Sequence, residues 1–145
     1  FLWNNYNRVL KRLYRQETTG SWAYALTTIR QANGSAANKV EIIQGLPEEE
    51  INLTILVSVT PSSTAGNAMA GFGEDTITDF TTEGFYQGGG GAVAWFVFSA
   101  YLQKIPTIGY HYYSWNERSN GTSCTFFAGT GANYWRAGIA GFIKG

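Results

Sequence analysis

Cysteine, histidine, proline and charge are all scarce in this chain. Its 145 residues include one cysteine, one histidine and three prolines, and only 14% of them are charged. Cys124 alone cannot form an internal disulfide, and one cysteine with one histidine cannot supply a two-cysteine, two-histidine zinc site. No apolar run reaches the roughly 20 residues that a helix needs to cross a bilayer. These absences exclude a disulfide-stapled fold, a zinc finger and a membrane-spanning helix.

Acidic and basic residues balance, with ten of each and a net charge of zero. The chain therefore has no general attraction to nucleic acid or to an anionic membrane. Its length suits one domain with its own core. Aromatic residues reach 16%, and a chain so aromatic and so poor in charge must hide surface, for which a subunit interface is one route. The sequence starts at Phe1, so we expect a fragment of a longer protein or a processed one.

Alternating apolar residues separated by turn residues indicate strands, and no helical periodicity is clear within the body of the chain. The clearest strand is residues 51–59, where every second residue is aliphatic. We predict further strands at residues 21–29, 39–43, 68–78, 92–103, 107–117, 122–127 and 134–143, and loops at 61–66 and 81–91. About eight strands with short turns predict an all-β, antiparallel β-sandwich or jelly roll over residues 21–145. Residues 1–20 are either a first strand or a linking and anchoring segment.

Residues 92–103 and 107–117 are apolar on both faces. Side chains alternate across a strand, so Trp95, Val97 and Tyr101 share one face of the first segment. A sheet with one face in water would instead alternate apolar and polar residues. Since the partner sheet of a sandwich covers one face, we predict that the other face meets a second copy of the chain. The predicted subunit contacts are Trp95, Val97, Tyr101, Tyr110 and Tyr112.

Aromatic rings that stay exposed can stack on sugars, so glycan contact is a second interpretation of this region. We predict it at Tyr113, Trp115 and Trp135. Any receptor site is otherwise expected on the loops, around residues 61–66, 81–91 and 118–121.

Residues able to do chemistry are few and carry no catalytic motif. We expect His111 to be packed and hydrogen-bonded in its apolar segment, and Cys124 to be a small buried hydrophobe. We predict no catalytic, metal or cofactor site. Arg30 is a candidate for a hydrogen bond across a subunit boundary.

Carboxylates gather in two places, and solvated turns or a polar outer face explain both. They are residues 48–50, and Glu74, Asp75, Asp79 and Glu83. A small hydrolase that uses Glu74, Asp75 or Glu117 remains a third hypothesis, because paired carboxylates can serve glycoside hydrolysis.

Several stretches resemble the small fibre or spike proteins of tailed bacteriophages. They are residues 2–9 (LWNNYNRV), 21–40 (SWAYALTTIRQANGSAANKV), 45–49 (GLPEE), 71–76 (GFGEDT), 109–117 (GYHYYSWNE) and 138–143 (GIAGFI). The likeness covers nearly the whole chain, and the block at 21–40 is its most specific part. It implies a virion component assembled in the bacterial cytoplasm, a trimeric jelly-roll knob of the TNF/C1q type on a head or tail fibre.

The same resemblance implies what such a protein contacts. Its partners would be two further copies of itself, other virion proteins of the capsid, tail or fibre stalk, and a host surface glycan. It implies no catalysis and transfers no binding residues. The sequence as a whole leaves three hypotheses: a non-enzymatic virion protein, a carbohydrate-binding β-sandwich module, and a small hydrolase.

Overall fold

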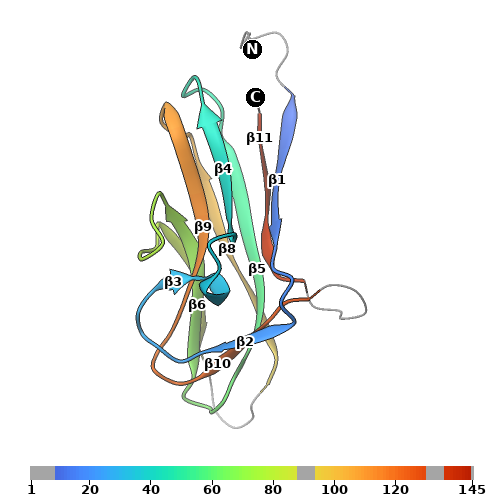
Figure 1. Cartoon of the computed structure of the whole chain (residues 1–145), viewed down its shortest axis with the longest axis vertical. Coiled ribbons are helices and arrows are strands. Elements are labelled where there is room, and N and C mark those ends of the chain that lie inside the picture. Colours follow the sequence, from blue (N-terminus) through green and yellow to red (C-terminus); the bar gives the residue numbers. More distant parts are fainter. Residues whose placement is uncertain (1–8, 88–93, 130–135, 145) are drawn as a thin grey trace.

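The computed structural model describes residues 9–87, 94–129 and 136–144 (Figure 1). Within these ranges the chain forms strands joined by turns, with one 3-10 turn at Ala32–Gly34. The strands are β1 (Leu10–Gln16), β2 (Ser21–Tyr24), β3 (Arg30–Gln31), β4 (Lys39–Gln44), β5 (Ile51–Pro61), β6 (Asn67–Glu74), β7 (Thr82–Gln87), β8 (Phe96–Lys104), β9 (Gly109–Ser119), β10 (Cys124–Phe127) and β11 (Gly138–Lys144). The predicted all-β class is confirmed. The described residues form no helix long and apolar enough to cross a membrane.

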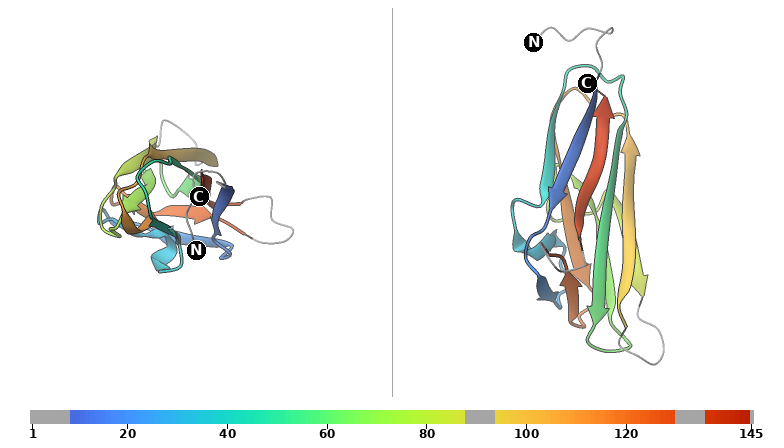
Figure 2. Two further views of the ribbon diagram at one scale, coloured as in Figure 1. Left: turned by 90° about the horizontal axis from the view of Figure 1, so that it is seen from above. Right: turned by 90° about the vertical axis from the view of Figure 1, so that its right-hand side faces the viewer.

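The strands make two antiparallel sheets that curve around one core (Figure 2). In the first sheet, β8 pairs with one edge of β5, while β10 and β11 lie end to end along the other edge. β2 and β1 then extend the sheet beyond β10 and β11. In the second sheet, β3 and β4 lie end to end along one edge of β9, and β6 and then β7 follow on the other side.

The end-to-end strands reveal the topology. If β1 with β2, β3 with β4, and β10 with β11 each count as one interrupted strand, the two sheets read 1-8-3-6 and 2-7-4-5 in chain order. Eight strands wound in this way form a jelly roll. The predicted antiparallel sandwich of jelly-roll type is therefore confirmed.

The core follows the alternation that the sequence shows. Along β5 the odd-numbered residues from Ile51 to Val59 are at most 2% exposed. Phe72, Tyr113 and Trp115 belong to the same buried cluster and come from the second sheet. Burying one such side chain contributes about 1.5–3 kcal/mol. A slip of one residue in register would turn this aliphatic row outward, so the core fixes the pairing.

The predicted strand at residues 21–29 is wrong in its second half. β2 ends at Tyr24, whose hydroxyl lies 2.8 Å from the carbonyl oxygen and 2.9 Å from the hydroxyl of Thr28. This contact folds residues 25–29 into a connection, and the chain resumes as β3 in the opposite sheet.

The predicted strand at 68–78 and the predicted loop at 81–91 also need correction. β6 stops at Glu74, because Asp75 has a φ of 55° that no strand residue adopts. Residues 82–87 of the predicted loop form strand β7 and pair with β6. Thr82, Phe85 and Tyr86 favour strands, but residues 82–87 show no apolar alternation and run into four glycines, which is why the sequence indicated a loop.

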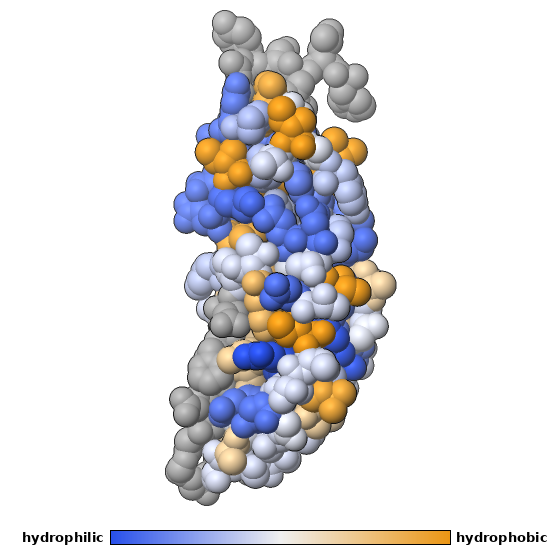
Figure 3. Space-filling model, turned by 90° about the vertical axis from the view of Figure 1, so that its left-hand side faces the viewer, coloured by the Kyte–Doolittle hydropathy of each residue, from blue (hydrophilic) through white to orange (hydrophobic). Residues whose placement is uncertain are grey.

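Residues 75–81 fold over the outer face of the second sheet. The Ser114 hydroxyl donates to the Thr76 carbonyl oxygen at 2.6 Å, and the Asn116 side-chain amide donates to that of Asp79 at 2.7 Å. A Cβ on Gly73 would lie 2.2 Å from the same Thr76 oxygen, so only glycine permits this close cover. The resulting side of the molecule mixes hydrophilic and hydrophobic residues (Figure 3).

Candidate functional site

The outer face of the first sheet carries a group of exposed apolar side chains that the described strands leave uncovered. β1, β11, β5 and β8 lie side by side on it (Figure 2, right). Its exposed apolar side chains are Leu10, Tyr14, Leu56, Trp95, Val97, Tyr101 and Phe142. The pairing register gives the outward positions, and among them only Arg12 and Lys144 are charged. No carboxylate lies at these positions, and the part of the face over β5 and β8 carries no charge, while Arg12, Lys144 and the neighbouring Arg136 lie on its β1–β11 side.

Three of the five predicted subunit contacts lie on this face. Trp95, Val97 and Tyr101 are 50%, 57% and 67% exposed, while Ala100 and Leu102, which point the other way from β8, are buried. Trp95 stacks on Phe127 with ring centroids 4.0 Å apart. One face of this segment is thus covered by the second sheet, and its other face is open in the single chain.

Tyr110 and Tyr112 lie elsewhere, so the five residues do not form one surface. They are on β9 in the second sheet and pair with β4, not with β8. The Tyr110 hydroxyl donates to Glu41, and the Lys39 ammonium lies 5.3 Å from the Tyr112 ring centroid. These polar and charged neighbours already engage both rings, which makes this surface less suited to a dry contact.

The predicted glycan contacts at Tyr113 and Trp115 are wrong. Both side chains are 0% exposed, because the first sheet covers the face of β9 from which they project. Trp22 and Phe126 stack with ring centroids 5.7 Å apart, and Trp115 meets Trp22 edge-on at 5.8 Å. A sugar cannot reach rings that fill the core. Trp135 lies outside the described residues.

Glu117 is a buried carboxylate surrounded by donors. The Trp22 indole nitrogen donates to one oxygen at 2.7 Å. The other oxygen accepts from the Arg30 guanidinium at 2.9 and 3.0 Å and from the backbone N–H of Asn33 at 3.1 Å. Burial raises the pKa of Glu117, and these donors act against that rise. Both oxygens are occupied, so this cluster ties β3 and the turn after it to β9 rather than forming a reaction centre.

This cluster also changes the interpretation of Arg30. Its guanidinium pairs with Glu117 and lies 3.8 Å from the Tyr24 ring centroid in the same chain. Arg30 is thus engaged within its own chain, and the expected hydrogen bond across a subunit boundary stays a prediction.

His111 takes part in a chain of hydrogen bonds. Its Nδ1 lies 2.7 Å from an Asp75 carboxylate oxygen, and its Nε2 lies 3.0 Å from the Thr107 hydroxyl. The order Thr–His–Asp resembles a catalytic triad, but Nε2 is also 3.1 Å from the Thr107 carbonyl oxygen. Which of the two Thr107 oxygens bonds to Nε2 depends on the ring tautomer, but both belong to the β8–β9 connection, so the ring is held between that connection and Asp75. The expected packed and hydrogen-bonded histidine is confirmed.

The remaining candidates are also held in local contacts. Glu74 pairs with Lys104 at 2.7 Å, and Cys124 is fully buried. Burial raises the pKa of the Cys124 thiol to about 11, which suits an inert core residue. Within the described part of the chain, no three histidine, cysteine or acidic residues come together as a metal site would require.

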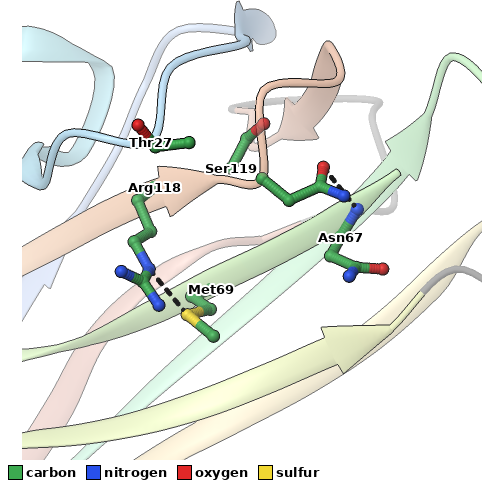
Figure 4. Close-up of a pocket in the computed structure, with 6 residues that line it drawn as sticks. Thr27, Asn67, Met69, Arg118 and Ser119 are labelled. Carbon is green, nitrogen blue, oxygen red and sulfur yellow. Dashed lines mark hydrogen bonds between the residues drawn. The ribbon is translucent and has the colours of Figure 1, made fainter. Parts of the chain in front are cut away.

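A hollow of about 320 Å³ lies where the β2–β3 and β9–β10 connections meet the start of β6 (Figure 4). Thr27, Asn67, Met69, Arg118, Ser119 and Asn120 line it. It includes part of the predicted receptor loop at 118–121. β1 begins and β11 ends at the opposite end of the sandwich (Figure 1). Arg118 falls within the predicted receptor loop at 118–121, although the sequence analysis did not single it out as a cation.

Comparison with protein-family models and with curated proteins finds no match to this chain.

Proposed function

We propose that this protein is a non-enzymatic virion component of a tailed bacteriophage, a jelly-roll knob that works as a homotrimer on a head or tail fibre. The observation that carries the proposal is the open outer face of the first sheet, which carries no charge over β5 and β8. The trimeric state and the virion setting rest on the resemblance of the sequence blocks to phage fibre and spike proteins. The jelly roll adds an analogy only, since viral capsid domains and lectins share this fold.

The chemistry of this face favours a second copy of the chain as its occupant. In a closed trimer the residues next to the three-fold axis meet their own copies, so a face rich in charge there would repel itself. Here the exposed side chains are Leu56, Val97, Tyr101 and Phe142, with threonine and asparagine between them on β5. Each has about half its surface left to bury, which contributes about 1 kcal/mol per side chain. Two such contacts per chain in a closed ring offset a large part of the cost of association.

Light scattering coupled to size exclusion tests the assembly. We expect a mass three times the 15.9 kDa of the chain. Val97→Lys with Tyr101→Lys should give monomers, because burying two ammonium groups without partners is unfavourable. Ile77→Lys is the matched control, since Ile77 is 46% exposed on the 75–81 loop over the other sheet. A monomeric wild-type chain at tens of micromolar, a usual working range, contradicts the trimer.

The virion setting has its own test. An antibody against the chain should decorate purified particles of the phage that encodes it, at sites repeated with the symmetry of the head or tail. Its absence from purified particles contradicts the proposal even if the chain is trimeric.

A carbohydrate-binding module is the second candidate. Tyr113 and Trp115, two of the aromatic residues that first suggested sugar binding, are buried and cannot stack on a sugar. The hollow around Arg118 is the feature that still favours it.

A further inference from the structure

Arg118 is a half-buried cation beside the hollow at the loop end, and among the described residues no carboxylate forms an ion pair with it. Its Nε donates to the Met69 sulfur at 2.8 Å, a contact seen in Figure 4. No acidic group of the described residues lies within 4.0 Å of the two terminal nitrogens. By contrast, Arg30 and Lys104 each pair with a carboxylate. A partly desolvated charge without a partner is costly, so this site favours an anion from outside the chain.

The wall of the hollow is held in place before any ligand arrives. The Asn120 side chain accepts from the Asn67 backbone N–H at 3.1 Å and donates to the Ala65 carbonyl oxygen at 2.8 Å. These bonds join the β9–β10 turn to the start of β6. The Met69 contact fixes the guanidinium, so its two terminal nitrogens keep the fork that binds a carboxylate through two bonds. Thr27 adds an exposed residue with a hydroxyl on the opposite wall.

Arg118 also lines a second hollow. It measures about 340 Å³, and Asp79, Phe80 and Thr82 are among its lining residues. The Asp79 carboxylate is exposed there, so it accepts hydrogen bonds from hydroxyl groups but repels a second negative charge. The pair of hollows thus fits a chain-like ligand with one acidic group at Arg118 and neutral hydroxyl-bearing units beside it. A polyphosphate or nucleic acid, with a charge on every unit, fits this arrangement poorly.

We propose that the two hollows around Arg118 bind an acidic oligosaccharide, with a sugar carboxylate on the Arg118 guanidinium and a neighbouring sugar over Phe80. Asp79 and Thr27 then act on sugar hydroxyls. Met69 is a positioning residue, because it holds the guanidinium without contacting the sugar. The site is built within one chain, so it does not depend on the trimer.

Calorimetric titration of the full chain tests this site. The probes are two trisaccharides: one with uronate and neutral sugars alternating, and the neutral trisaccharide of the same linkage. We expect binding of the acidic probe only, weakening as salt rises. Arg118→Gln should weaken it at least tenfold, the effect expected for loss of a charged two-bond contact. Arg136→Gln is the matched control, since Arg136 is exposed beside β11 over the other sheet, and its binding should equal that of wild type.

Two further arms sharpen the result. Asp79→Asn should improve binding of a trisaccharide with a uronate at every position, because it removes the repulsion in the second hollow. Val97→Lys with Tyr101→Lys should bind the acidic probe as wild type does, which separates this site from the assembly surface. Equal affinity for acetate and for the acidic trisaccharide means a simple anion site and overturns the proposal. Undiminished binding by Arg118→Gln, or no binding of the acidic probe, overturns it as well.

Discussion

Replacing Glu117 with glutamine tests whether the buried carboxylate cluster fixes the connection from β2 to β3 against β9. The substitution keeps the shape of the side chain and removes its charge. Glutamine has one acceptor oxygen, whereas Glu117 accepts from Arg30 and Asn33 on one oxygen and from Trp22 on the other. If the amide oxygen faces Arg30, the amide nitrogen meets the Trp22 N–H, donor against donor.

The magnitude follows from these contacts. Leaving a buried N–H such as that of Trp22 unpaired costs about 1–3 kcal/mol. Breaking a buried ion pair costs about 3–5 kcal/mol, but the Arg30 side chain is 36% exposed and water recovers part of that loss. We therefore expect Glu117→Gln to lower the free energy of unfolding by about 3 kcal/mol. For a chain of this size the melting temperature should fall by about 9 °C.

Denaturant unfolding followed by far-ultraviolet circular dichroism measures the change. Wild type and variant are compared at one chain concentration, because assembly would make stability depend on concentration. Both are measured at pH 8. Glu41→Gln is the control: Glu41 forms an exposed pair with Lys39, so little change is expected. A loss below about 1 kcal/mol for Glu117→Gln, or a loss equal to that of the control, refutes the assigned role of the cluster.

Three other outcomes are expected. Cys124 should resist iodoacetamide at pH 8 in the native chain and react once the chain is unfolded, since burial raises its pKa to about 11; rapid native alkylation contradicts this. Gly73→Ala should destabilise by about 1–3 kcal/mol, because its Cβ meets the Thr76 carbonyl oxygen at 2.2 Å. Gly20→Ala, with nothing within 4 Å, is its control and should change little. Partial burial opposes the shift, but the Tyr112 N–H and His111 hold the pKa of Asp75 below its ordinary value of 3.8. The folded state thus binds this proton less readily than the unfolded state, and the stability that Asp75 adds should disappear as pH falls from about 4 through the lowered pKa. The gap between wild type and Asp75→Asn should then close, and a gap that widens in acid contradicts the argument.

Some parts of the fold could be predicted from the sequence because one local signal decided them. The alternation at residues 51–59 is such a signal, and β5 covers this range with its aliphatic row buried. Residues 82–87 gave no such signal, since pairing with β6 determines that strand. Residues 21–29 misled because apolar and threonine residues continue past Tyr24, while a tertiary hydrogen bond to Thr28 ends the strand.

The aromatic residues show why the site was harder to predict than the fold. Alternation says which side chains share a face, but not which face meets the second sheet. Trp95 and Trp115 look alike in sequence, yet one is 50% exposed and the other has no exposed surface. The choice between them depends on the pairing of strands far apart in the chain. The same limit applied to Arg118, whose neighbours Met69 and Thr27 come from other elements.

The two proposals make opposite demands on charge, and the molecule separates them in space. A contact between identical copies needs a face without repulsion, and the outward side of β5 and β8 carries no carboxylate and no cation among its register positions. Recognition of an acidic ligand needs a fixed cation, and Arg118 lies on the second sheet near the loop end. In a trimer closed through the first sheet, the Arg118 hollows of all three copies would stay open to solvent. Weak binding at each site would then add up on a repeating polysaccharide, because one chain of sugars can engage several sites at once. The monomeric Val97→Lys, Tyr101→Lys variant should therefore match wild type on the trisaccharide but bind a long acidic polysaccharide far more weakly. Equal binding of the long polymer by the monomer and by wild type would contradict the argument that assembly strengthens binding at the Arg118 hollows.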